Sequence, residues 1–178
     1  MLARSLLFAA AASLSLAACS STEMDSAAAG MGMPSDPTPE QRGPYVMMAA
    51  SSDMYEIQSG QLAQQRSQTA AVRQFGAMLV QHHTQTTQQL MAAAQASGTP
   101  MPSGMMPLHA EMLRRLQAAS ASEFDRMFQM QQVTAHEMAL ALHTNYGRNG
   151  DTPALRQTAM AAAPIVQQHL TLARNYRR

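Results

Sequence analysis

The sequence has few cysteines, few aromatic residues and almost no net charge. It contains a single cysteine, Cys19, no tryptophan and no lysine, and only 4% of its 178 residues are aromatic. One thiol excludes an intramolecular disulfide and a metal site of several cysteines. The 12 basic residues are all arginines and face 11 acidic residues. A chain so close to neutral lacks the basic surface of nucleic-acid-binding proteins, so no nucleic-acid partner is expected.

The first 19 residues have the organisation of a bacterial lipoprotein signal. A short basic start, Met1 to Arg4, is followed by the apolar "SLLFAAAASLSLAA" and then by "LAAC", which ends at Cys19. The tetrapeptide resembles the lipobox, in which the cysteine becomes the lipidated first residue of the mature protein. The alternative is an ordinary secretory signal with an unrelated cysteine.

We therefore expect residues 1–18 to be a signal peptide and the mature chain to lie in the periplasm. Ser20, rather than an aspartate, follows the cysteine. By resemblance to Gram-negative lipoproteins, this favours the outer membrane over the inner membrane, so the expected partner is outer-membrane lipid attached at Cys19. Cleavage removes Arg4 and no acid, which leaves 11 basic against 11 acidic residues. No feature indicates a particular protein partner.

The remainder divides into a tether and one helical domain. Residues 19–43 are dominated by Ser, Ala, Gly and Pro without an apolar period, which predicts a flexible tether. From residue 44 to residue 178, Ala, Met, Gln, Leu and Arg favour helices. The breakers "SGTPMPSG" and "GRNGDTP" predict long helices at about 44–66, 69–96, 122–146 and 152–175, and a short helix at about 106–119. The predicted fold class is all-α, a four-helix bundle with one extra short helix.

Each long helix places one polar residue at or near its predicted core face. At 100° per residue, His83 falls within the apolar stripe of the second helix, whereas His82 lies on its flank and is expected at the surface or a helix boundary. His169 lies within the stripe of the last helix, and His136 lies on an apolar face of the third long helix. The first helix has a face of small residues, and Glu56 is predicted to be the only acidic residue on that face.

These four residues allow two interpretations. Buried polar groups cost free energy unless they are paired, and the set could pair as a hydrogen-bonded network that fixes the bundle register. It could instead hold a single transition metal, because three histidines and one glutamate suit zinc, copper(II), nickel or iron(II). The chain has no Glu-x-x-His pair, which disfavours di-iron chemistry. It has no Gly-x-Ser-x-Gly, His-Glu-x-x-His or phosphate-binding loop either, so a non-enzymatic protein is favoured.

Three segments resemble one bacterial family. In order, these are "MYEIQSGQLAQQRSQTAAVRQFGAMLVQHHTQTTQQL", "FDRMFQMQQVTAHEMAL" and "AAAPIVQQHL". They resemble domain of unknown function 4142 (DUF4142), a family of envelope proteins, over about residues 44–175. The resemblance implies a ferritin-like helical bundle, and the family's motifs fall on Glu56, His83, His136 and His169.

The chain departs from the family pattern at two positions. The family usually has an aspartate before the histidine of the second helix, where this chain has His82, and often has asparagine where this chain has Thr87. These departures predict that a carboxylate orienting His83 is missing. Since such outer partners support metal ligands, the departures count against a metal site.

Methionine is abundant, with 17 residues. The segment "MPSGMMP" places Met101, Met105 and Met106 in a predicted loop. Thioethers are soft ligands for copper(I), so this loop is an alternative metal site. Methionines also fill gaps in cores with few aromatics. The resulting hypothesis is a lipid-anchored, non-enzymatic envelope protein whose biochemical role is unassigned, with a role in envelope stress as one candidate. Its alternative is a periplasmic metal-binding protein that uses the Glu/His set or the methionine-rich loop.

Overall fold

The computed structural model describes residues 37–175, which form five helices and no strand. The helices are α2 (Arg42–Arg66), α3 (Ala70–Ala96), α4 (Pro107–Ala118), α5 (Phe124–Asn149) and α6 (Pro153–Asn175). The predicted all-α helical bundle, with four long helices and one short one, is confirmed. Helix ends differ from the predicted ones by at most three residues, the largest difference being the end of α5 at Asn149 instead of residue 146.

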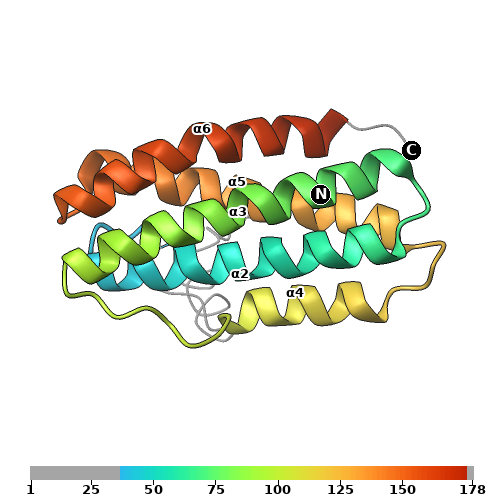
Figure 1. Cartoon of the computed structure of the whole chain (residues 1–178), viewed down its shortest axis with the longest axis horizontal. Coiled ribbons are helices and arrows are strands. Elements are labelled where there is room, and N and C mark those ends of the chain that lie inside the picture. The colour runs from blue at the N-terminus through green and yellow to red at the C-terminus, as the bar shows by residue number, and fades with distance from the viewer. Residues whose placement is uncertain (1–36, 176–178) are drawn as a thin grey trace, which may run out of the picture.

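The four long helices form two hairpins that pack against each other (Figure 1). Helix α2 pairs with α3 and α5 pairs with α6, while α3 packs on α6 and α2 packs on α5. The connection from α3 to α5 crosses the length of the bundle and contains α4, which lies outside the four-helix core against α2 and α5. A single long crossover is the connectivity of ferritin-like bundles.

Two apolar clusters fill the two ends of the bundle. One contains the stacked rings of Tyr45 and Tyr146, whose centroids lie 3.8 Å apart. The other contains Phe75, Phe124 and Phe128. Between them, all four long helices contribute buried polar residues: Asp53, Glu56, His83, Gln132, His136 and His169. We call these six residues the polar layer.

Two glycines let α2 and α3 approach closely beside the polar layer. A Cβ atom on Gly60 or on Gly76 would lie 2.6 Å from the carbonyl oxygen of the other residue. Only glycine lacks the Cβ that would prevent this contact. Gly60 lies one helical turn after Glu56, and Gly76 lies two turns before His83. The glycine pair therefore fixes the spacing of the two helices that carry these residues.

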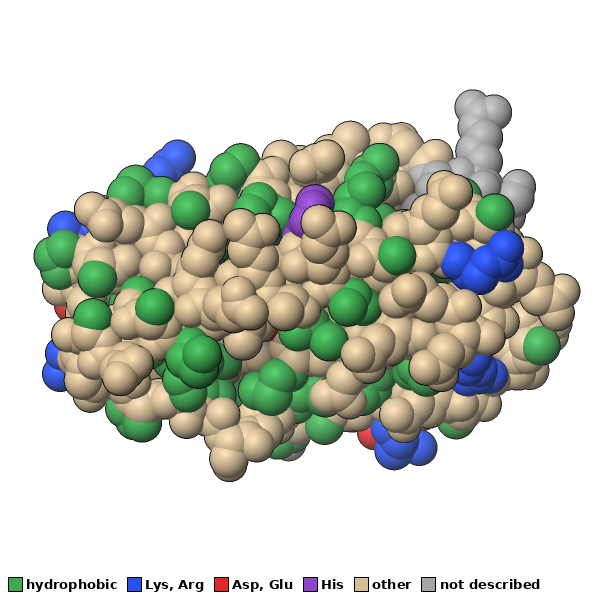
Figure 2. Space-filling view, viewed as in Figure 1, with side chains coloured by type: hydrophobic (Ala, Val, Ile, Leu, Met, Phe, Trp, Pro, Cys, Tyr) green, Lys and Arg blue, Asp and Glu red, His purple; other side chains and the backbone are tan. Residues whose placement is uncertain are grey.

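Several predictions concern residues outside the described part of the chain. The signal peptide, Cys19 and the tether up to residue 36 lie there, and α2 begins at Arg42, two residues before the predicted domain start. No helix within residues 37–175 has the length and apolar character needed to cross a membrane. On the face drawn in Figure 2, arginine side chains lie towards the two ends of the bundle, and a histidine is visible near its middle.

Candidate metal centre

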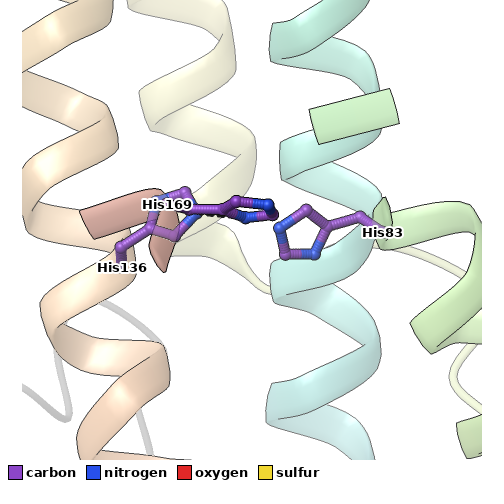
Figure 3. Close-up of side chains that lie close together, drawn as sticks. All are labelled: His83, His136 and His169. Atoms are coloured by element: carbon purple, nitrogen blue, oxygen red, sulfur yellow. Dashed lines mark hydrogen bonds between the residues drawn. The ribbon is translucent and has the colours of Figure 1, made fainter. Parts of the chain in front are cut away.

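Three histidines from three helices meet in the polar layer. His83 comes from α3, His136 from α5 and His169 from α6, and none is more than 2% exposed. Each offers one ring nitrogen, and these three atoms lie within 4.8 Å of one another. Figure 3 shows the three rings directed toward a common centre inside the bundle. We call this group the histidine centre.

In two of the three rings, the nitrogen that faces away from the other rings contacts an oxygen atom of the protein. His83 Nδ1 lies 2.8 Å from Asp53 Oδ1, and His136 Nδ1 lies 2.8 Å from the carbonyl oxygen of Gln132. A carbonyl or carboxylate oxygen accepts a hydrogen bond, so in each pair the Nδ1–H group donates. A neutral imidazole with its proton on Nδ1 carries its lone pair on Nε2. In its neutral form, each of these two rings therefore has a lone pair on Nε2 that could bind a metal ion, the arrangement usual for metal-binding histidines.

The third ring is linked to the surface through His82. His169 Nε2 lies 2.8 Å from His82 Nδ1, and the two rings stack with centroids 5.1 Å apart. His82 is half-buried, in agreement with its predicted position at a helix boundary. Its contact with His169 was not predicted from the sequence, because the helical wheel places a residue on its own helix and says nothing of the neighbouring one.

The prediction that His83 lacks an orienting carboxylate is wrong. Asp53, on α2 and 5% exposed, accepts hydrogen bonds from His83 and from the hydroxyl groups of Thr86 and Thr87, at 3.0 and 3.1 Å. The carboxylate comes from another helix instead of from the residue beside His83 in sequence. Its position three residues before Glu56, and so on the same side of a helix, was the available signal. Glu56 is thus not the only acid on this face.

Glu56 borders the histidine centre without belonging to the group of three. It is 1% exposed, and its Oε1 lies 3.6 Å from His136 Nδ1. Within residues 37–175, neither carboxylate oxygen has a hydrogen-bond partner, and the same is true of His83 Nε2 and Gln132 Oε1. Burial raises the pKa of Glu56 to about 8, against the opposing effect of His83. Buried polar atoms without partners are rare and call for a bound ion, a water molecule or another cause.

The electrostatics keep at least two of the rings neutral. Burial, together with the positive charge of His83, lowers the pKa of His136 to about 3 and that of His169 to about 2. Burial alone would also lower the pKa of His83, but the hydrogen bond and charge of Asp53 raise it above its usual value. Because a metal binds neutral imidazole, His136 and His169 need no deprotonation at neutral pH.

The family model described as "Domain of unknown function (DUF4142)" matches residues 25–176. The chain belongs to this family. The resemblance predicted from its motifs is therefore confirmed, and the match also covers residues of the predicted tether. Comparisons of this DUF4142 chain with curated proteins and with solved structures found no match.

The loop methionines of the DUF4142 chain are divided between two clusters. Met106, which is 8% exposed, lies in the apolar cluster of Tyr45, and Met101 packs against the same cluster. Met105 packs against a separate group that contains Tyr55 and Leu113. Met101 and Met106 thus pack with one cluster and Met105 with another. A shared soft-metal site at these three methionines stays a prediction.

Proposed function

We propose that this DUF4142 protein binds one divalent transition metal ion at the histidine centre. His83, His136 and His169 would be the protein ligands, and Glu56 would take the fourth position after rotation of its side chain. The observation that carries the proposal is the way in which the two nitrogens of each ring are placed. Each has one nitrogen facing the other two rings, and each outer nitrogen faces a polar group of the protein.

The spacing of the rings supports a small ion. His136 Nε2 and His169 Nδ1 form a hydrogen bond at 3.3 Å, and a bound ion would take the place of this bond. Two nitrogens bound at about 2.05 Å to a tetrahedral ion lie roughly 3.3 Å from each other. Zinc fits this geometry, and copper(II), nickel and iron(II) also accept imidazole with carboxylate. Asp53, and Glu56 once it loses its proton on metal binding, would offset the charge of a buried divalent ion.

The exposure of the ligands favours binding over turnover. His83, His136 and His169 are 2%, 1% and 0% exposed. A substrate would have to displace packed side chains to reach the ion, which disfavours an enzyme. The lipoprotein-like N-terminus supports the remaining part of the proposal, a periplasmic protein attached at Cys19 to outer-membrane lipid.

Metal titration tests the proposal. The full chain carrying Cys19→Ser, which removes the thiol, is titrated with zinc, copper(II), nickel and iron(II) separately, and thermal unfolding is followed. We expect one ion per chain and a stabilisation of about 2.7 kcal/mol at a free metal concentration of roughly 100 Kd. Both effects should disappear in the variant with His83→Ala and His169→Ala.

The control is His143→Ala, which removes a buried histidine that contacts Tyr45 instead of the histidine centre. This variant should still bind one ion. If no metal binds to the parent chain, and both variants merely unfold at lower temperature, the polar layer is a structural hydrogen-bonded network and the metal proposal is wrong.

A further inference from the structure

A small cavity lies between α2, the start of α4 and α5. Its volume is about 20 Å³, room for one water molecule or one ion. Its lining residues are Met48, Ser52, Met106, His109, Ala135, Met138, Ala139 and Leu142. We propose that this cavity binds a soft monovalent cation, copper(I), through the thioethers of Met48, Met106 and Met138 and the imidazole of His109.

The three methionines reach the cavity from three different segments. Met48 lies on α2, Met106 directly precedes α4, and Met138 lies on α5. Met48 and Met106 are 6% and 8% exposed, so their thioethers are shielded from water. Thioether sulfur is a soft, neutral ligand that selects copper(I) over the harder divalent ions. Met106 belongs to the loop predicted from sequence, whereas Met48 and Met138 come from helices.

His109 is oriented by the residue that also holds Met106. Ser51 Oγ accepts the backbone N–H of Met106 at 2.8 Å and lies 2.7 Å from His109 Nδ1. A hydroxyl oxygen has two lone pairs, so Ser51 can accept from both groups. In that arrangement His109 carries its proton on Nδ1 and has its lone pair on Nε2. Burial lowers the pKa of His109 to about 4, which keeps the ring neutral at neutral pH.

The charge of the lining sets the charge of the ion. None of the eight lining residues is acidic, so a divalent ion would be buried without a counter-charge, at a high desolvation cost. A monovalent ion carries half that charge. The histidine centre differs, because Asp53 and Glu56 lie beside it. The two sites share no residue, so the copper(I) proposal does not depend on the divalent one.

The test uses Ag(I) as a redox-inert equivalent of copper(I), with copper(I) itself added under anaerobic conditions. The full chain again carries Cys19→Ser, and His83→Ala with His169→Ala silences the histidine centre. On this background, Met48→Leu, Met106→Leu and Met138→Leu are combined, because leucine conserves methionine volume at small cost. The matched control is Met101→Leu with Met105→Leu, two methionines of the same loop that do not line the cavity.

We expect one tightly bound Ag(I) per chain, an affinity at least a hundredfold lower in the triple leucine variant, and no change in the control. In methyl NMR of ¹³C-methionine-labelled parent protein, Ag(I) should perturb three methionine signals. This measurement does not need the triple variant, so it tests the proposal even if that variant does not fold. The proposal is overturned if the triple variant binds Ag(I) as the parent does, if the Met101/Met105 control loses binding, or if no methionine signal of the cavity shifts.

Discussion

His83, His136 and His169 lie together in the polar layer, whereas His109 and His143 are buried elsewhere, each beside one hydroxyl group. All five are less than 10% exposed, so burial does not distinguish them. Their partners do: His109 faces Ser51 and His143 faces Tyr45, at 2.7 and 3.2 Å. In the histidine centre, rings face rings, and a carboxylate holds one of them.

The comparison teaches that a buried histidine becomes a ligand candidate through its second nitrogen. A lone imidazole beside a hydroxyl is a satisfied core residue unless other ligands face it. Several imidazoles held from outside and facing one another form a preorganised donor set. The following changes sharpen or break this difference.

The largest effect on metal affinity short of removing a ligand is expected for Asp53→Asn. An amide in place of the carboxylate can turn its N–H toward His83 and no longer fixes the tautomer that exposes Nε2. We expect zinc affinity to fall about 10- to 100-fold, measured by calorimetric titration. Asp125→Asn is the matched control, since that carboxylate accepts from Thr69 outside the polar layer. An equal loss in both variants would contradict the role given to Asp53.

Acid should destabilise the metal-free protein. Burial lowers the pKa values of His109, His136, His143 and His169, so below about pH 6.5 the unfolded chain binds more protons than the folded one. Each of these four histidines lowers the free energy of unfolding by about 2 kcal/mol as the pH falls from about 6.5 to about 5.

Glu56 has a raised pKa and opposes this loss in the same range, whereas most of the effect of His83 lies above it. Four groups outweigh one, so the net stability falls. Urea unfolding at a series of pH values measures the slope, and His143→Gln should make it shallower. If stability instead increases as the pH falls from about 6.5 to about 5, the buried rings are protonated in the folded state.

Glu56→Gln should separate stability from metal binding. Folding protonates Glu56 between its usual pKa of 4.5 and its folded pKa of about 8, so its contribution to stability falls as pH rises through this range. Glutamine removes that cost, and the metal-free variant should be more stable than the parent at about pH 8. Glutamine keeps a neutral oxygen that can occupy the fourth position and removes only the negative charge, so metal affinity should fall about tenfold.

The control for this change is Glu137→Gln, which alters an exposed carboxylate paired with Arg174. Unfolding and zinc titration at about pH 5 and about pH 8 compare the two variants. If Glu56→Gln destabilises the metal-free protein as pH rises, Glu56 is ionised and partnered in the fold, contrary to its assigned state.

The smallest effect is expected for Tyr45→Phe, at the isolated His143. The variant loses the hydroxyl that contacts His143 Nδ1 and keeps the ring that stacks on Tyr146. Loss of one neutral hydrogen bond costs about 1 kcal/mol, which chemical denaturation detects. Zinc affinity should not change. A loss as large as that of Asp53→Asn would place His143 within the metal site and remove the distinction between the two groups.

The helices and the inward direction of two histidines could be predicted from the sequence. His83 and His169 lie within apolar stripes, and a period of 3.6 residues reports burial on a single helix. Contacts between helices could not be predicted in this way, because they depend on the rotation and register of both partners. The link of His83 to Asp53 and that of His169 to His82 are of this kind.

For Glu56 too, burial could be predicted from the sequence, whereas its contacts with other helices could not. The small residues around it predicted burial, and the structure shows 1% exposure. Its distance from the other ligands depends on how far apart α2 and α5 lie, a quantity that no local pattern contains. The cavity of Met48, Met106 and Met138 could not be predicted either, since its lining comes from three segments distant in sequence.

The contact between Gly60 and Gly76 has a consequence for ionic radius. A methyl group on either residue would meet the backbone of the other at 2.6 Å, so α2 and α3 would have to separate. Metal–ligand distances tolerate changes of only about 0.2 Å. A wider spacing between Glu56 on α2 and His83 on α3 would therefore fit a larger ion than zinc. In the proposed metal site, Gly60 and Gly76 would therefore limit the size of the ion, although neither residue is a ligand.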